Sequence, residues 1–162
     1  MAEVLAIENM LAKIYEPKRK NQWIISIDGI DSFTAVSTKR PSFTTEEHVI
    51  DYMNAKRYVA GKRTYETIEL TLKDPITPSA MQKVMEWNNL IYQPETGRMG
   101  YTSFYMKEVV LKLLDPMGVV IEKWVIHNAW ITSNDFGELN YTTGEPLEIR
   151  ITIRFDWATL EY

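Results

Sequence analysis

Few side chains in this sequence have the types and spacing that catalysis or metal binding requires. The chain contains two histidines, His48 and His127, and no cysteine. Each histidine falls in a strand-like segment, without carboxylate or histidine neighbours at the spacing of metal ligands. A catalytic site needs a nucleophile, a base and an orienting group within reach of one another, and the sequence offers no such set. We therefore predict a protein that is not an enzyme and has no catalytic, metal-binding or cofactor-binding residues.

Two further motifs resemble chemical sites but lack essential members. Gly61-Lys62-Arg63-Thr64 resembles a phosphate-binding loop, but the Walker pattern requires Gly where Lys56 stands and Ser or Thr where Arg63 stands. Glu145 and Glu148 could act as an acid and base pair only if a helix aligned them, and their region has a strand pattern. Both motifs are better explained as solvated surface.

Clusters of basic residues raise the question of nucleic-acid binding. Residues 1–63 hold ten basic and eight acidic groups, whereas residues 64–162 hold eight and fourteen. A protein that binds duplex DNA usually concentrates positive charge on one face, and halves of opposite sign suit contacts between copies of one chain. Ordinary surface charge is the alternative explanation.

The composition indicates one folded domain with an unusual number of aromatic residues. A chain of 162 residues suits a single domain, and its 45% apolar content can form a core without disulfides. No apolar run approaches the roughly 20 residues of a membrane-spanning helix, and the N-terminus lacks a signal-peptide pattern, so we expect the protein to stay in the cytosol. Aromatic residues make up 12% of the chain, and strands and buried interfaces favour such residues.

Two helices are predicted to flank the strands. One apolar face at helical spacing is formed by Val4, Ile7, Leu11 and Ile14. This face predicts an amphipathic helix over residues 2–15, and proline and charge then favour an extended connector over residues 16–20. A second helix is predicted to have Thr77 as its cap and Pro78 as its first residue.

Most of the remaining chain alternates apolar and polar residues as β-strands do. Residues 23–27 lead into the turn pair Asp28-Gly29, so we expect residues 33–37 to pair back on them. Residues 65–73 form a further predicted strand. A second hairpin is predicted over residues 105–127, and residues 133–144 are expected to be irregular.

Two other strand segments have patterns that bear on function. A long hairpin of mixed polarity is predicted over residues 46–63, with its turn near Asn54-Ala55. Residues 147–157 are predicted to form one strand with an unbroken apolar face. The opposite face of that strand alternates in charge and should be exposed or line a polar channel: Glu148, Arg150, Thr152, Arg154 and Asp156.

Particular residues along this strand order resemble a known family. The opening strand contains Asn21, Trp23, Ile25 and Ile27; the entry to the Leu-Thr-rich strand contains Gly61, Arg63, Tyr65, Leu70, Thr71 and Leu72; and a helix bearing Trp87 comes next. Residues 128–141 then combine a small-aromatic-apolar loop with an acidic, Leu and aromatic segment. From residue 21 to residue 156 the chain resembles the tail tube proteins of contractile-tailed bacteriophages, which are related to the inner tubes of type VI secretion and other contractile injection systems.

The resemblance implies a mainly β (α+β) fold. It implies two packed antiparallel sheets that form a sandwich or barrel, with a flanking helix and a long protruding hairpin. Residues 1–20 would be an N-terminal helix and connector outside this β domain, which spans residues 21–162. Family members assemble into hexameric rings that stack into a hollow tube, so neighbouring subunits would continue one another's sheets and cover exposed edges.

The resemblance also assigns roles to surface residues. The hairpin would contact a neighbouring subunit or ring, and loop aromatics would be buried there. The resulting interface candidates are Tyr52, Met53, Lys56, Arg57, Tyr58, Val59, Lys62, Arg63, Trp130, Phe136 and Tyr141. The charge-alternating face of residues 148–156 becomes a candidate lining of the tube lumen, because a DNA conduit should avoid net positive charge.

The expected function is therefore a structural protein of a phage tail tube, through which DNA is ejected inside a contractile sheath. Its implied partners are itself, the tail sheath, baseplate, tail terminator and tape measure proteins, with DNA passing transiently and no insertion into a membrane. Its implied location is the virion tail, assembled in the host cytoplasm. Two alternatives remain: an inner tube protein that delivers protein effectors, and, less favoured, a monomeric β-sandwich that binds a ligand.

Overall fold

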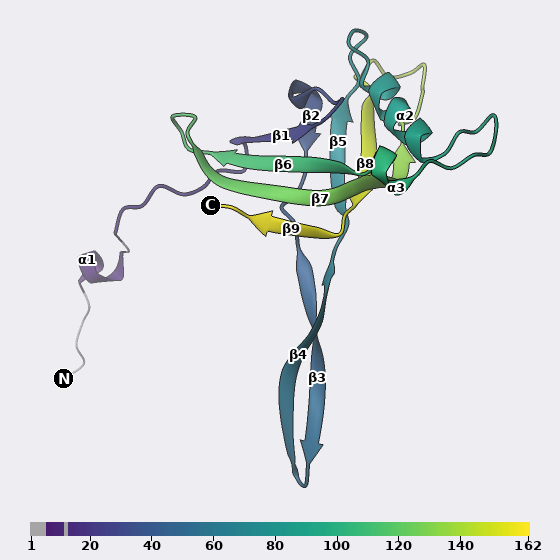
Figure 1. Ribbon diagram of the computed structural model, residues 1–162. Helices are drawn as coiled ribbons and strands as arrows, with labels where there is room; N and C mark the ends of the chain where they lie inside the picture. Colours follow the sequence, from purple (N-terminus) through teal and green to yellow (C-terminus); the bar gives the residue numbers. More distant parts are fainter. Residues whose placement is uncertain (1–5, 12) are drawn as a thin grey trace.

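The computed structural model describes residues 6–11 and 13–162. The fold is mainly β: a seven-stranded sheet of order β1-β6-β7-β8-β5-β2, with β9 also paired to β7, and a separate two-stranded hairpin, β3-β4 (Figure 1). The strands are β1 Trp23–Ile27, β2 Ala35–Ser37, β3 Phe43–Tyr52, β4 Ala55–Tyr65, β5 Ile68–Lys73, β6 Lys107–Leu114, β7 Val120–Asp135, β8 Glu148–Arg154 and β9 Trp157–Leu160. The helices are α1 Ile7–Met10, α2 Ala80–Ile91 and α3 Thr102–Tyr105, with a 3₁₀ turn, η1, at Ser32–Thr34. This architecture confirms the predicted fold class.

Strand β7 joins the two halves of the sheet. Its first half pairs with β6 and β9, and its last residues pair with β8. Asn128, in the middle of the strand, has a φ of 56°, a left-handed conformation that Asn tolerates better than most residues, and its amide donates to Asp156 Oδ2 at 2.8 Å. The pairing register with β8 also shifts between Ile131 and Ser133. These irregularities let one strand serve both layers, which run in crossing directions in Figure 1.

The two halves of the sheet enclose a single core. Alternate residues of β5 and β8 point inward and pack with residues of β1 and β6 from the other half. Helix α2 completes the core with Val84 and Trp87, which are fully buried, and the Trp87 indole donates to the backbone oxygen of Tyr105 at 2.7 Å. One continuous apolar cluster therefore supports both layers.

The predicted N-terminal helix is largely wrong within the described residues. Helix α1 has one turn, Leu11 already has extended backbone, and residues 13–15 are not helical. The described residues of the apolar face are exposed to solvent: Ile7 by 71%, Leu11 by 69% and Ile14 fully. A single unsupported turn has little stability, because most helix stability in proteins comes from packing. Residues 2–5 and 12 of the predicted helix lie outside the described residues.

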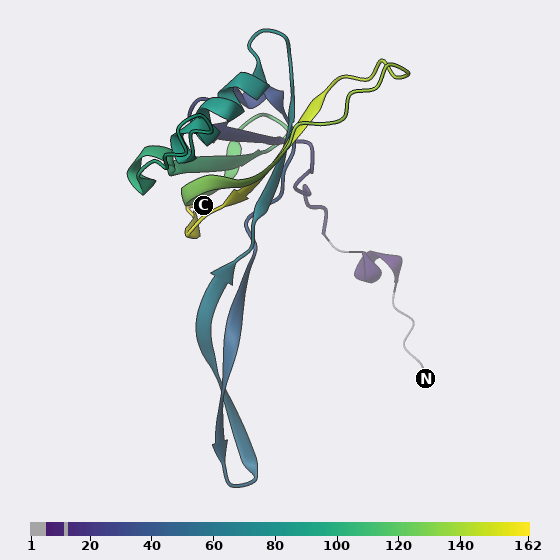
Figure 2. The same ribbon diagram turned by 90° about the vertical axis from the view of Figure 1, so that its right-hand side faces the viewer.

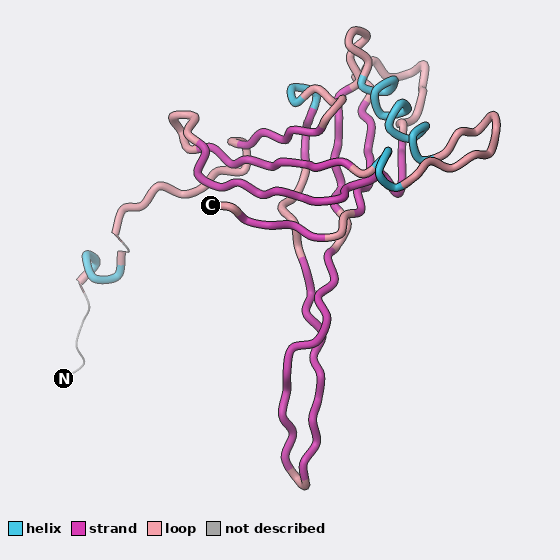
Figure 3. The backbone as a smooth tube through the Cα atoms, viewed as in Figure 1, coloured by secondary structure: helices cyan, strands magenta, loops and turns pink. Residues whose placement is uncertain are grey.

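Two predicted strand arrangements are also wrong. The Asp28-Gly29 turn is present, but η1 redirects the chain after it, so β1 pairs with β6 and β2 pairs with β5 (Figure 3). The segment predicted as one strand over residues 147–157 is divided between β8 and β9, because the chain bends at Asp156, whose N–H donates to the His127 oxygen at 3.2 Å. The predicted irregular stretch starts later, since β7 continues to Asp135.

The start of the second helix differs by two residues from the prediction. Ser79, not Thr77, is the N-cap, and its hydroxyl accepts from the Gln82 N–H at 3.4 Å. Pro78 precedes the cap, so it is not the first residue of the helix. The helix itself is present as predicted, and it buries Ala80, Val84 and Trp87.

Two leucines test where the stability of the fold resides. Leu70 is fully buried and Leu139 is 82% exposed. In the dissociated subunit, Leu70→Ala should lower the free energy of unfolding by about 2–5 kcal/mol, because it leaves a cavity in the core. The same change at Leu139 should cost less than about 0.5 kcal/mol. Urea unfolding followed by circular dichroism measures both, and equal effects would contradict this assignment of the core.

Candidate assembly surfaces

The β3-β4 hairpin projects far from the body and is exposed along nearly its whole length (Figure 2). Every residue of β3 and every residue of β4 except Tyr65 is exposed. A two-residue turn, Met53-Asn54, closes it one residue earlier than predicted. An isolated two-stranded ribbon is marginally stable in water at best, so a hairpin of this length needs either a firm base or a partner.

The base of the hairpin is anchored by aromatic packing. The Phe43 and Tyr65 rings, opposite each other in the register, meet edge to face at 5.7 Å between centroids, and Tyr65 contacts Phe155 of the core cluster at 5.6 Å. The Arg63 guanidinium lies 4.0 Å from the Phe43 ring centroid, within cation–π range. Arg63 thus has a structural role here, beside the interface role predicted for it.

The register divides the predicted hairpin residues between two faces. Opposite residues share a face, so Lys56 and Tyr58 lie on one side, and Tyr52, Arg57 and Val59 lie on the other. Beyond the aromatic base, both faces are exposed to solvent. Tyr52, Met53 and Tyr58 are 71%, 86% and 61% exposed. Both faces carry apolar and charged side chains, a mixture more typical of a binding surface than of a core.

The three remaining predicted interface residues lie on the body, apart from the hairpin. Trp130 in β7 is half-buried and meets the Tyr105 ring edge to face at 6.3 Å. Phe136 is half-buried against the core. Tyr141 is fully exposed in the connection between β7 and β8. The structure therefore does not gather all the predicted residues into one patch.

The predicted lumen residues lie on the outer face of the β5-β8 layer. Glu148, Arg150, Thr152 and Arg154 alternate with the buried isoleucines of β8. In the register Glu148, Arg150 and Thr152 lie beside polar residues of the neighbouring strands, which sequence reasoning had not included: Glu69, Thr71, Lys73, Ser133 and Asp135. Arg154 lies opposite Trp130. Acidic and basic groups are balanced on this face, three of each. Asp156 follows the end of β8 and does not extend the face.

A buried carboxylate, not predicted from the sequence, connects the hairpin and the N-terminal connector to the sheet. Glu122 in β7 is 4% exposed. It accepts from Lys18 of the connector, from Arg40 in the segment before β3 at 3.4 Å, and from the Trp124 indole at 2.6 Å. Burial raises the pKa of Glu122, but the three hydrogen bonds outweigh burial and leave the pKa below its usual range.

Within residues 6–11 and 13–162, the structure shows no group of three or more His, Asp or Glu side chains placed to hold a metal ion. In the same part of the chain, no helix has the length and apolar character needed to cross a membrane.

Comparison with known proteins identifies the family. The family model described as "T4-like virus tail tube protein gp19" matches residues 19–157, which is most of the chain. The chain belongs to this tail tube family. No curated protein sequence matches it. The family is one of structural tube proteins, and the predicted resemblance is confirmed.

Solved structures show that the tail tube fold is shared with contractile injection systems. A chain of an extracellular contractile injection system, PVC, from the sheath/tube terminator in the extended state has a TM-score of 0.74 at 18% identity, covering 93% of this chain and 100% of that one. A chain of the PVC sheath-tube complex has a TM-score of 0.67 at 17% identity, covering 98% and 99%. Hcp1 from Flavobacterium johnsoniae has a TM-score of 0.50 at 11% identity, covering 86% and 94%. At these identities the likeness establishes the fold.

The Glu122 cluster should make the stability of the subunit depend on pH. The pKa of Glu122 is lowered in the folded chain, so its contribution is present above the ordinary value of about 4.5 and is lost as the pH falls through the folded pKa. Glu122→Gln should lower the free energy of unfolding by about 1–3 kcal/mol at pH 7, and the difference should shrink below about pH 4.

Urea unfolding of the dissociated subunit at pH 7 and at pH 3.5 measures this effect. Glu86→Gln, a change on the outside of α2, serves as the control. A loss for Glu122→Gln that is the same at both pH values would contradict the assignment.

Proposed function

We propose that this tail tube protein assembles into hexameric rings that stack into a hollow tube inside a contractile sheath. The observation that carries the proposal is the hairpin: a family member presents a 23-residue ribbon, residues 43–65, and beyond the aromatic base at Phe43 and Tyr65 its large apolar side chains are exposed. Exposed apolar surface of this kind typically marks a protein interface. The hairpin would contact an adjacent subunit or ring, with Lys56, Arg57 and Lys62 setting its register.

The open edges of the sheet support assembly into a ring. Strands β1 and β2 lie at the two ends of the sheet, and β9 pairs only with β7. Each of these three strands therefore has one edge that pairs with no other described strand. Such edges are templates for pairing with another chain. In a closed ring each edge would meet a neighbouring subunit, which removes the risk of uncontrolled association.

The charge-balanced face of β5 and β8 fits the lumen of such a tube. With equal numbers of acidic and basic groups, the surface would not accumulate the phosphate contacts that hold nucleic acid. We propose that this face lines the channel and that DNA passes through it during ejection. The protein would then have a structural role without a catalytic step.

The remaining partners follow from this role. We propose that the tube contacts a tail sheath along its length, a baseplate and a terminator at its ends, and a tape measure protein inside it. Support comes from the similar PVC chains, which belong to a sheath-tube complex and a sheath/tube terminator. The tube would be built in the host cytoplasm as part of a virion tail.

A second candidate is an inner tube that delivers protein effectors. The likeness to PVC, an extracellular contractile injection system, favours this cargo. The two candidates share the architecture and differ in what passes through the channel. A monomeric ligand-binding domain would leave the exposed hairpin without a role.

Shortening the hairpin tests the proposal. His48 and Val59 are opposite in the register, so Asn-Gly in place of residues 49–58 should close a shorter hairpin without disturbing its base. We expect the purified wild-type protein to form rings and tubes in negative-stain electron microscopy, and the shortened variant to remain a folded subunit that forms no tubes. Tubes of normal length from the variant, or a strictly monomeric wild type at high concentration, would contradict the proposal.

A single introduced thiol tests which face lines the channel. Because the chain has no cysteine, Thr152→Cys provides a unique label on the face of β8. In assembled tubes a small maleimide should react, whereas a large polymer-linked maleimide should react at least about tenfold more slowly because it cannot enter a narrow channel. Dissociated subunits are the control and should react with both. Equal rates in tubes would place this face on the outside.

A further inference from the structure

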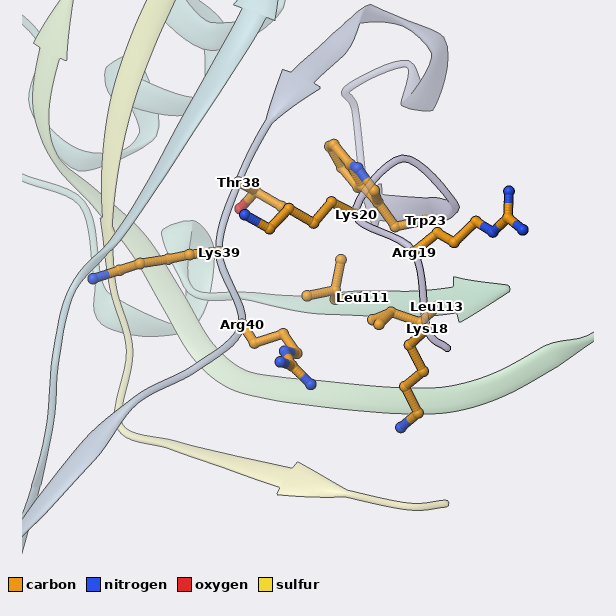
Figure 4. Close-up of a pocket in the computed structure, with 9 residues that line it drawn as sticks. All are labelled: Lys18, Arg19, Lys20, Trp23, Thr38, Lys39, Arg40, Leu111 and Leu113. Atoms are coloured by element: carbon orange, nitrogen blue, oxygen red, sulfur yellow. The ribbon is translucent and has the colours of Figure 1, made fainter. Parts of the chain in front are cut away.

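A basic pocket lies where the N-terminal connector, the segment before β3, and strands β1 and β6 meet (Figure 4). It has a volume of about 430 Å³. Its apolar floor is formed by Trp23, Leu111 and Leu113, and its rim carries five cationic side chains, Lys18, Arg19, Lys20, Lys39 and Arg40. An apolar floor with a cationic rim suits a ligand that carries both apolar side chains and carboxylates.

Part of this positive charge has no ion-pair partner among the described residues. Lys18 and Arg40 are bound to Glu122, and Arg19 pairs with Glu16 at 3.2 Å. Within residues 6–11 and 13–162, neither Lys20 nor Lys39 forms an ion pair. The Thr38 hydroxyl oxygen on the pocket wall is buried and has no hydrogen-bond partner in the same part of the chain. Lys20 therefore offers an unpaired ammonium group at the pocket, whereas the Lys39 side chain at its edge extends away from the other labelled side chains in Figure 4 and would have to turn to meet an incoming acidic group.

The connection between β7 and β8, residues 136–147, carries the complementary chemistry. It projects from the body as a long loop (Figure 2) and contains Glu138 and Glu145 but no basic residue. Its Leu139 and Tyr141 are 82% and 110% exposed. The Asn140 side chain accepts from the Thr142 N–H at 3.0 Å, which stabilises a local turn beside both apolar residues.

The loop and the pocket are separate surfaces of one subunit. No residue of the loop lines the pocket, so the two can meet only between copies in this conformation. Different surfaces in contact make a head-to-tail interface, which generates rings or stacks. The distribution of charge along the sequence is consistent with such an interface. The pocket's cations lie in residues 1–63, which carry net positive charge, and the loop lies in residues 64–162, which carry net negative charge.

We propose that residues 136–147 of one copy dock in the basic pocket of the next, an inference that rests on the proposed self-assembly. Glu138 or Glu145 pairs with Lys20, and with Lys39 once that side chain turns toward the pocket, while Leu139 and Tyr141 cover the apolar floor. This contact between loop and pocket would hold neighbouring copies together independently of the hairpin.

Reciprocal charge reversal tests this contact. Lys20→Glu with Lys39→Glu should raise the subunit concentration needed for assembly roughly tenfold or more, because like charges would face each other. Glu138→Lys with Glu145→Lys should have the same effect. Combining all four changes in one chain should restore assembly, since each pocket and loop are complementary again. Neither lysine contacts Glu122, so the subunit should fold normally, which circular dichroism and thermal unfolding would verify.

A matched control reverses two charges in another exposed loop, Glu95→Lys with Arg98→Glu, and should assemble like the wild type. Sedimentation and negative-stain electron microscopy measure the assembled fraction. If the wild type does not assemble, the proposed function fails. If the wild type assembles and both double variants assemble equally well, or if the fourfold variant stays dissociated, this inference alone is overturned.

Discussion

One sixteen-residue strand, β7, holds this subunit together by hydrogen-bonding on both sides and in both layers. A strand can belong to two crossing layers only if its backbone bends, and in β7 the bend is made by the left-handed conformation at Asn128 and the register shift after Ile131. The core depends on this geometry, because inward-facing residues of both layers reach one apolar cluster only when the sheet curls. Glu122 on the same strand then fixes the connector and the segment that leads to the hairpin.

The subunit is asymmetric in where its apolar side chains lie. Helix α2 and the curled sheet bury Trp87 and their inward-facing isoleucines and leucines, whereas the hairpin, the β7–β8 loop and α1 leave large apolar groups in water. Burial of apolar surface is worth about 25 cal/mol per Å², and the subunit does not gain this free energy for the parts of these side chains that stay exposed. In the proposed assembly, contacts with other chains would cover these segments and supply stability that they lack in isolation.

The sequence allowed the fold class, the hairpin and the family to be predicted, because period-two alternation and local turn chemistry are short-range signals. The pairing of strands was harder to predict from the sequence. No residue pattern around residues 28–37 indicated that η1 would redirect the chain so that β2 pairs with β5 and not with β1. The bend at Asp156 could not be predicted either, because apolar and polar residues alternate without interruption through that position. The candidate surfaces followed the same division. The outward face of β8 could be identified from its alternation of polar and apolar residues. Its neighbours on β5 and β7 could not, because they depend on the pairing register. The Glu122 cluster was also inaccessible, because Glu122 is separated in sequence from Arg40 by 82 positions and from Lys18 by 104 positions.

The direction of the hairpin has a mechanical consequence. In Figure 1 the hairpin is in line with β5, into which β4 leads after two residues. Tension along the hairpin would therefore pull β5 lengthwise past β8. Ladder hydrogen bonds run across the strands, so such a load is shared in shear by all six residue pairs of the β5–β8 register instead of opening them one at a time. A tube driven forward by a contracting sheath would transmit force between rings through the most resistant direction of its own sheet.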